Sequence, residues 1–226
     1  MKEFFAGNPV SRDYRHLAHR LCQPQMNKLA LIYFLYTLIV SVGSAIAVGV
    51  LAGVGSALIS LCTGAFVFSL INISKNVYLG IQVKTNDLFY GFNHFVRALC
   101  INLLSGLYVA LWSLIPIVGP FIGMVKAYSY AMAPYIALDN PDMGYNDCIT
   151  RSRELMNGNK WQLFCLGLSY IGWYILSCFT FGILSFWISP RAQQANFLFY
   201  LKVSGIGYAV EEERERLENE AKGIFE

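Results

Sequence analysis

Long apolar stretches dominate this chain and restrict it to folds that a lipid bilayer can solvate. Six of them approach the length of about 20 apolar residues that a membrane-spanning helix needs. They cover roughly residues 29–50, 55–74, 98–117, 119–138, 161–178 and 182–201. Only 14% of the residues are charged, whereas a soluble domain has about 25%. We therefore predict an all-α integral membrane protein with about six transmembrane helices.

The apolar stretches are predicted to pair into three hairpins. The first pair reverses in the glycine-rich segment 49–55, where small residues favour a turn. The second reverses at 116–120, which begins and ends with proline, because two prolines cannot both lie inside an undisturbed helix. The third reverses near residues 178–181. None of these three turns carries a charge.

The positive charges lie in the segments between the hairpins. These segments contain Lys2, Arg12, Arg15, Arg20 and Lys28, then Lys75, Lys84 and Arg97, and then Arg151, Arg153 and Lys160. Loops rich in Lys and Arg stay on the cytoplasmic side of a membrane. We therefore predict a multi-pass protein of the cell membrane with both termini cytoplasmic. Residues 1–202 are expected to form a single helical membrane domain, and residues 203–226, with seven acidic and three basic side chains, an acidic cytoplasmic tail.

A short amphipathic segment precedes each predicted hairpin. In the first, apolar residues recur at helical spacing from Tyr14 to Cys22, arginines and histidines occupy the other positions, and Ser11 is available as the N-cap. Its pattern predicts a helix that lies in the cytoplasmic interface.

The other two amphipathic segments show the same pattern. The second begins near residue 87 and has an apolar side formed by Leu88, Phe92, Phe95 and Val96. The third has an apolar stripe over residues 145–156 and ends at Asn157-Gly158, a helix C-terminal signal. We therefore expect an interfacial helix before every hairpin.

Three motifs in the second half of the chain resemble a known family. They are KAYSYAMAPY at 126–135, SRELMNGNK at 152–160 and LSYIGW at 168–173. Together they are similar to a bacterial integral membrane family, the domain-of-unknown-function family numbered nine hundred and seventy-five, over roughly residues 11–202. The resemblance implies a six-span helical membrane fold, with no established activity or catalytic residues. Arg191, directly after Pro190, departs from the uncharged residue expected of the family at that place.

Two basic residues fall inside predicted spans. A central Lys or Arg costs on the order of 3 kcal/mol to insert, so such residues usually face a partner or a water-filled cavity. Lys126 and Arg191 are therefore candidates for a polar cavity that holds an anionic headgroup or substrate. The other candidate cavity residues are Gln193, Gln194 and Asn196. In the alternative interpretation Lys126 extends to the outer interface and the sixth span breaks at Pro190, which leaves Arg191 near water.

The arginines of the amphipathic segments form a candidate surface for anionic lipid or for a protein partner. They are Arg12, Arg15, Arg20, Arg97, Arg151 and Arg153. Basic residues beside a membrane attract anionic headgroups, so we expect membrane lipids as partners, with a membrane or cytoplasmic protein as a further possibility and no nucleic acid.

No pattern of a catalytic or metal site is present. His16, His19 and His94 lie in the amphipathic segments, without a zinc-protease motif, nucleophile elbow, phosphate loop or paired carboxylates. The six cysteines lack metal or redox spacing. We therefore expect no enzyme and no cofactor or metal, but a membrane module that binds anionic lipid or docks a partner. The alternative is a transporter or lipid-handling protein with a cavity around Lys126 and Arg191.

Overall fold

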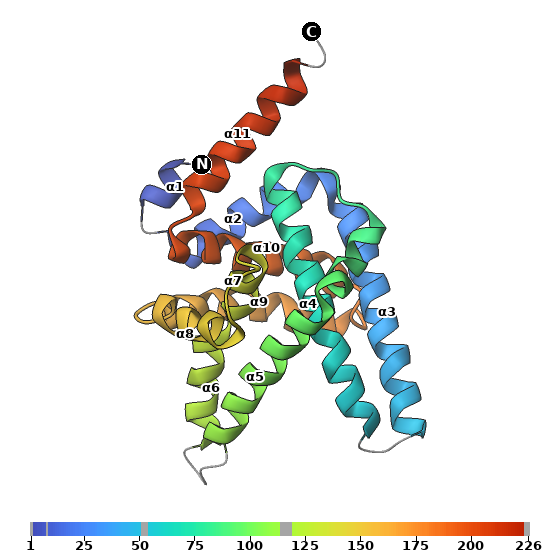
Figure 1. Ribbon diagram of the computed structural model, residues 1–226. Coiled ribbons are helices and arrows are strands. Elements are labelled where there is room, and N and C mark those ends of the chain that lie inside the picture. The colour runs from blue at the N-terminus through green and yellow to red at the C-terminus, as the bar shows by residue number, and fades with distance from the viewer. Residues whose placement is uncertain (1, 8, 51–53, 114–118, 224–226) are drawn as a thin grey trace. The chain divides into compact units, whose positions relative to one another are not determined.

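The computed structural model describes residues 2–7, 9–50, 54–113 and 119–223, and throughout these ranges the chain forms helices and turns without a β-strand (Figure 1). The predicted all-α class is therefore confirmed. The helices group into two compact units. Unit 1 comprises residues 1–33, 73–85 and 162–226, and unit 2 comprises residues 34–72 and 86–161.

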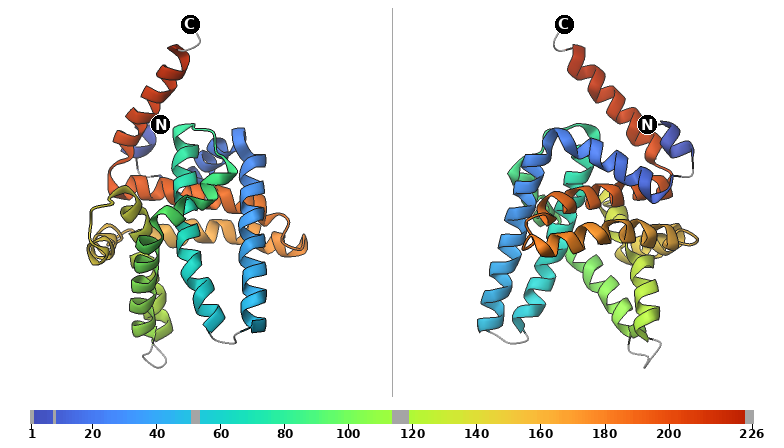
Figure 2. Two further views of the ribbon diagram at one scale, coloured as in Figure 1. Left: turned by 45° about the vertical axis from the view of Figure 1, so that its right-hand side comes forward. Right: turned by 180° about the vertical axis from the view of Figure 1, so that it is seen from behind.

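Unit 1 is built around a single buried helix, α10. Its helices are α1 (Lys2–Ala6), α2 (Ser11–Cys22), the short 3-10 helix η1 (Gln23–Gln25), most of α9 (Lys160–Phe179), α10 (Ser185–Ser204) and α11 (Gly207–Gly223), with the start of α3 (Met26–Val50) and the end of α4 (Val54–Leu79). In α10, all five residues from Phe197 to Leu201 are buried. After α9 the chain turns over residues 180–184, and α10 runs back along α9 (Figure 2). The predicted third turn is thus present.

Helix α2 packs its apolar face on α10. Tyr14, Leu17, Ala18 and Cys22 are buried, and the rings of Tyr14 and Phe199 lie 5.9 Å apart. The amphipathic helix predicted here is therefore confirmed, but its predicted N-cap is wrong. Val10 is the N-cap, and its N–H donates to the Asp13 carboxylate at 2.9 Å. A carboxylate in the first turn satisfies a free N–H and complements the helix dipole, so Val10 serves as the N-cap and Ser11 is the first residue of the helix.

Unit 2 is organised by α5. Its helices are parts of α3 and α4, the 3-10 helix η2 (Thr85–His94), α5 (Phe95–Ser113), α6 (Gly119–Tyr130), α7 (Ala133–Asp139) and α8 (Tyr145–Leu155). Helix α5 contacts α6, α7 and α8. On α8, Cys148, Ile149 and Ser152 are buried, and Gly158 has a φ of +82° beyond its C-terminus. The third predicted amphipathic helix and its stop are thus confirmed.

The second amphipathic segment differs from its prediction. Its first part forms η2 rather than an α-helix, and Phe95 and Val96 already belong to α5. While Leu88 is buried, Phe92 and Val96 are exposed. The cause lies at Gly91, whose N–H donates to Ser69 Oγ at 2.8 Å. A Cβ on Gly91 would lie 1.9 Å from the Ala65 carbonyl oxygen. This close approach to α4 fixes a 3-10 backbone, which repeats every three residues and does not align an i, i+4 stripe.

The stretch predicted as one span at 119–138 is interrupted. Helix α6 ends at Tyr130, and α7 begins at Ala133 with Pro134 in its first turn. Pro134 has no N–H to continue the helical hydrogen bonds. Ser152 of α8 bridges the break, because its hydroxyl donates to the Ser129 carbonyl at 2.8 Å and accepts the Met132 N–H at 3.2 Å.

Among the described residues, three helical stretches are long and apolar enough to cross a membrane: Ser11–Ala45, Thr85–Ser113 and Lys160–Phe179. Helix α10, which corresponds to the sixth predicted span, is not one of them. Its first half contains Pro190, Arg191 and two amide side chains, Gln193 and Gln194, and Asn196 follows. The first and second predicted turns include residues 51–53 and 114–118, which lie outside the described residues.

Candidate functional site

A pocket of about 400 Å³ in unit 1 collects basic and aromatic side chains from α2, α9 and α10. Its basic residues are Arg15, His16, His19 and Arg191. Its remaining walls are Tyr170, Trp173, Leu184, Trp187 and Ile188. Of these described lining residues none is acidic, so the pocket has a positive potential that favours an anion. We call it the basic pocket.

The two arginines of the basic pocket are only partly satisfied by the protein. Arg15 Nη1 donates to the Ser169 carbonyl at 3.0 Å, which ties α2 to α9. The Nε atoms of Arg15 and Arg191 are both buried without a hydrogen-bond partner. Gln194, one turn further along α10, is 1% exposed, and its Nε2 also has no partner. Buried N–H groups nearly always have acceptors, so the donors around Arg191 fit an anionic oxygen.

His19 adds a donor to the pocket. His19 Nε2 lies 3.2 Å from the Gln23 amide nitrogen. In the tautomer in which Nε2 accepts that amide N–H, Nδ1 carries the proton. His19 Nδ1 is buried and has no hydrogen-bond partner. The pocket can thus offer a neutral N–H beside its two guanidinium groups.

The aromatic wall lies against the backbone of α10. Tyr170 Oη donates to the Arg191 carbonyl at 3.3 Å. Trp173 and Trp187 are 50% and 39% exposed. Trp and Tyr favour the membrane–water interface, because one end of the ring is apolar and the other can donate to water or to a headgroup. The wall is therefore suited to the region where a headgroup meets its acyl chains.

The structure brings together residues from both predicted site sets. Arg15 was predicted as part of a basic surface and Arg191 as part of a polar cavity, and both line the basic pocket. Arg12 is exposed, with its Nε 3.4 Å from His16 Nε2. Arg20 lines a neighbouring pocket of about 560 Å³ in unit 1. The three amide residues of α10 do not line the basic pocket: Gln193 and Asn196 are partly buried, and Gln194 is buried.

The other predicted site residues lie in unit 2. Lys126 Nζ is 4.5 Å from the centroid of the Trp112 ring, a cation–π contact. This contact favours the alternative in which Lys126 lies at an interface, where Trp is enriched. Arg151 pairs with Glu154 at 3.1 Å, and Arg153 is exposed. The cavity predicted around both Lys126 and Arg191 stays a prediction.

Arg97 has structural contacts that a surface role does not explain. Its Nε donates to the Ala137 carbonyl at 3.0 Å, and its Nη2 donates to the Asn140 and Met143 carbonyls at 2.6 and 2.9 Å. Burial raises the pKa of the Cys148 thiol, and the Arg97 guanidinium beside it opposes that shift. The guanidinium thus holds the C-terminal end of α7 and the turn into α8 together, and the role of Arg97 in a binding surface stays a prediction.

Comparison with known protein families tests the resemblance predicted from the sequence motifs. Residues 117–206 match the sequence model of a family described as a protein of unknown function, DUF975. The resemblance to DUF975 is confirmed over this range. The DUF975 match includes α9 and α10 and therefore Tyr170, Trp173 and Arg191, whereas Arg15 on α2 lies outside it. No curated protein and no solved structure matches the chain.

Sequence reasoning missed part of the basic pocket. The sequence places His16 and His19 only on the polar side of an amphipathic helix, and it presents Tyr170 only as part of a family motif. The sequence signal for the histidines was their position one turn from each other beside Arg15. No local signal could have paired them with α10, because the pocket forms only when α10 folds against α2.

Proposed function

We propose that this protein is a multi-pass, non-enzymatic membrane module that binds the headgroup of an anionic phospholipid in the basic pocket. The observation that carries the proposal is the convergence of Arg15 and Arg191, from helices far apart in sequence, in a pocket whose described lining has no carboxylate. Their Nε atoms are buried without partners. A phosphodiester oxygen is the acceptor that fits them.

Phosphate is favoured by the geometry of the donors. A guanidinium presents its N–H groups as a planar fork, which matches phosphate oxygens and strengthens the hydrogen bonds through charge. Leu184 and Ile188 continue the same pocket as an apolar wall. A ligand with a phosphate at one end and hydrocarbon at the other uses both parts, and a phospholipid has this form.

The membrane topology is part of the proposal. It comprises six spans in three hairpins, both termini in the cytoplasm and the interfacial helix α2 on the cytoplasmic face of the cell membrane. The three long apolar stretches and the distribution of Lys and Arg support it. On this face the basic pocket meets the leaflet whose anionic lipids attract basic segments.

The test removes the two pocket charges and compares them with two exposed charges. The variant Arg15→Gln/Arg191→Gln and the control Arg151→Gln/Arg153→Gln lose the same net charge. Binding of a fluorescent phosphatidylglycerol to the purified protein in a neutral detergent is measured for both. Hydrogen bonds to charged groups are worth about 1.5–3 kcal/mol each, so the pocket variant is expected to bind at least about tenfold more weakly.

The control distinguishes binding at a defined site from a general effect of the protein's positive charge on lipid affinity. Arg151 and Arg153 are exposed on α8, so their loss is expected to change affinity less than about threefold, as for other exposed charge pairs. Phosphatidylcholine binding should change little in either variant. Equal weakening by both charge pairs, or no weakening by the pocket pair, would contradict a headgroup site.

A further inference from the structure

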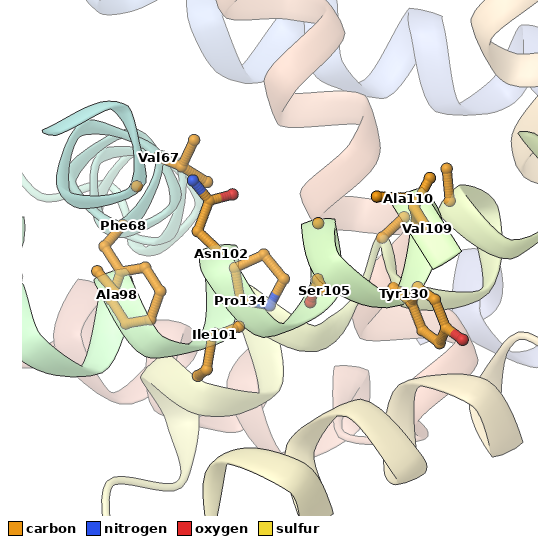
Figure 3. Close-up of a pocket in the computed structure, with 14 residues that line it drawn as sticks. Val67, Phe68, Ala98, Ile101, Asn102, Ser105, Val109, Ala110, Tyr130 and Pro134 are labelled. Atoms are coloured by element: carbon orange, nitrogen blue, oxygen red, sulfur yellow. The ribbon is translucent and has the colours of Figure 1, made fainter. Parts of the chain in front are cut away.

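We propose that unit 2 contains a second lipid site, a pocket that holds one acyl chain of a membrane phospholipid between α4, α5, α6 and α7. This pocket has a volume of about 470 Å³. Its walls include Phe68 of α4, Ile101 and Val109 of α5, Tyr130 of α6 and Pro134 of α7 (Figure 3). Its residues lie in unit 2, so the proposal does not rest on the basic pocket. We call it the chain pocket.

The chain pocket has the dimensions of a single hydrocarbon chain. Its lining residues on α5 run from Ala98, on the left of Figure 3, to Ala110, on the right. Twelve residue steps of a helix cover about 18 Å, and half of the hydrocarbon core of a bilayer is about 15 Å thick. Along α5 the pocket is therefore long enough to take one acyl chain of a single leaflet.

Two glycines that line the pocket have different surroundings: one lies at a close contact between helices and the other beside open space. Small residues in membrane helices usually let backbones approach closely. Gly64 does so, because a Cβ there would lie 3.1 Å from the Ala98 carbonyl oxygen. Gly106 also lines the pocket, but a Cβ there would meet nothing within 4 Å. The space beside Gly106 is therefore not used for helix contact and is open to a ligand.

The chain pocket lies beside a helix that is expected to contact lipid acyl chains, and these chains are the proposed occupant. Helix α5 belongs to one of the stretches long and apolar enough to span a membrane. Gly106 and Ala110 are exposed at the pocket wall, so the pocket opens at the surface of the unit. In a membrane-spanning helix that surface contacts acyl chains. Apolar lining, length and medium together select a chain rather than a headgroup.

Ser105 provides a test that distinguishes an acyl chain from a polar ligand. Ser113 and Ser129 donate their hydroxyls to the carbonyl four residues earlier, at 2.9 and 3.0 Å. Ser105 Oγ is buried in the pocket wall without a hydrogen-bond partner. A hydroxyl against hydrocarbon is unfavourable. Ser105→Ala is therefore expected to retain an acyl chain as well as the wild type does or better, whereas a ligand with a polar group at this position would be lost.

The experiment maps where an acyl chain contacts the full-length protein. The protein is reconstituted with a phosphatidylcholine whose acyl chain carries a diazirine, irradiated, digested, and its adducts are located by mass spectrometry. Adducts are expected on the peptides that contain residues 98–110 and 127–134. Gly106→Leu and Ala127→Leu fill the pocket from α5 and from α6, and each is expected to lower these adducts at least about fivefold.

The control is Gly43→Leu on α3 of the same unit, where an added Cβ also meets nothing within 4 Å. It should leave the adducts unchanged, and adducts on α9 peptides serve as the internal reference. Variants are compared only as monodisperse protein, and because Gly106→Leu and Ala127→Leu act from different helices, either one decides the outcome. Unchanged adducts in a folded filling variant, or a loss of adducts in Ser105→Ala, would overturn the proposal. The neutral headgroup of the probe, and unchanged adducts in Arg15→Gln/Arg191→Gln, keep this outcome separate from that of the basic pocket.

Discussion

Arg97→Gln should destabilise unit 2 strongly, although the sequence presents this arginine as one of several surface charges. Its guanidinium donates to the Ala137, Asn140 and Met143 carbonyls. These carbonyls end α7 and form the turn into α8, and the arginine comes from α5. A single side chain therefore holds the C-terminal end of one helix and the connection to the next.

The magnitude follows from the three hydrogen bonds. Each hydrogen bond from a charged donor contributes about 1.5–3 kcal/mol when it is sheltered from water. The bonds to Ala137 and Met143 are part-buried, and the bond to Asn140 is exposed. Because one guanidinium makes all three bonds, their sum is not additive, and we expect a loss of about 3 kcal/mol. For a protein of this size that corresponds to a fall in Tm of about 6–12 °C.

The assay is thermal unfolding of the full-length protein in detergent, followed by tryptophan fluorescence and by loss of the monodisperse peak. The matched control is Arg151→Gln, which loses only an exposed pair with Glu154 and should cost less than about 0.5 kcal/mol. Arg97→Lys keeps the charge without the planar fork and should fall between the two. The reasoning is refuted if Arg97→Gln and Arg151→Gln shift the Tm equally, or if Arg97→Gln weakens lipid binding without lowering the Tm.

Two further predictions concern buried hydroxyls. Tyr78 is fully buried and donates to Glu211, which is 5% exposed, at 2.5 Å. Tyr78→Phe leaves that carboxylate without its donor and should lower stability by about 1.5–3 kcal/mol in thermal unfolding, whereas Tyr208→Phe at an exposed ring should have little effect, and equal shifts would argue against a role for the Tyr78–Glu211 contact. Ser152→Ala removes both hydrogen bonds across the break between α6 and α7 and should cost about 1–3 kcal/mol. Hydrogen exchange of the Met132 amide should then increase, and an unchanged rate would show that Ser152 does not hold the break.

The helices could be predicted from sequence wherever a local pattern determines them. Over the described residues each of the six apolar stretches lies mostly on helix, and most of the apolar stripes of α2 and α8 are buried as their spacing predicts, with Tyr145 exposed. Local patterns failed where a distant residue decides the backbone. The 3-10 helix η2 depends on Gly91 meeting Ser69 and Ala65 of α4. The break before α7 had a local signal in Pro134, but its stabilisation by Ser152 had none.

The candidate site was predictable in its parts and not as a whole. Arg191 stood out because a charge in an apolar stretch is costly, and Arg15 because it lies on the polar side of an amphipathic helix. Their convergence depends on α10 packing along α2, a contact between opposite ends of the chain. Tyr170 enters the pocket for the same reason, because its hydroxyl reaches the Arg191 carbonyl only after α9 and α10 have folded together.

The most direct measurement of the central claim is the proximity of lipid phosphorus to the arginines of the basic pocket. Protein labelled with ¹³C at arginine Cζ is reconstituted into phosphatidylglycerol vesicles, and ³¹P-induced dephasing of the arginine signals is recorded by solid-state NMR. Signals assigned to Arg15 and Arg191, by their loss in the glutamine variants, should dephase strongly and remain so at high salt. Dephasing confined to exposed arginines such as Arg12, and abolished by salt, would contradict a headgroup site in the pocket.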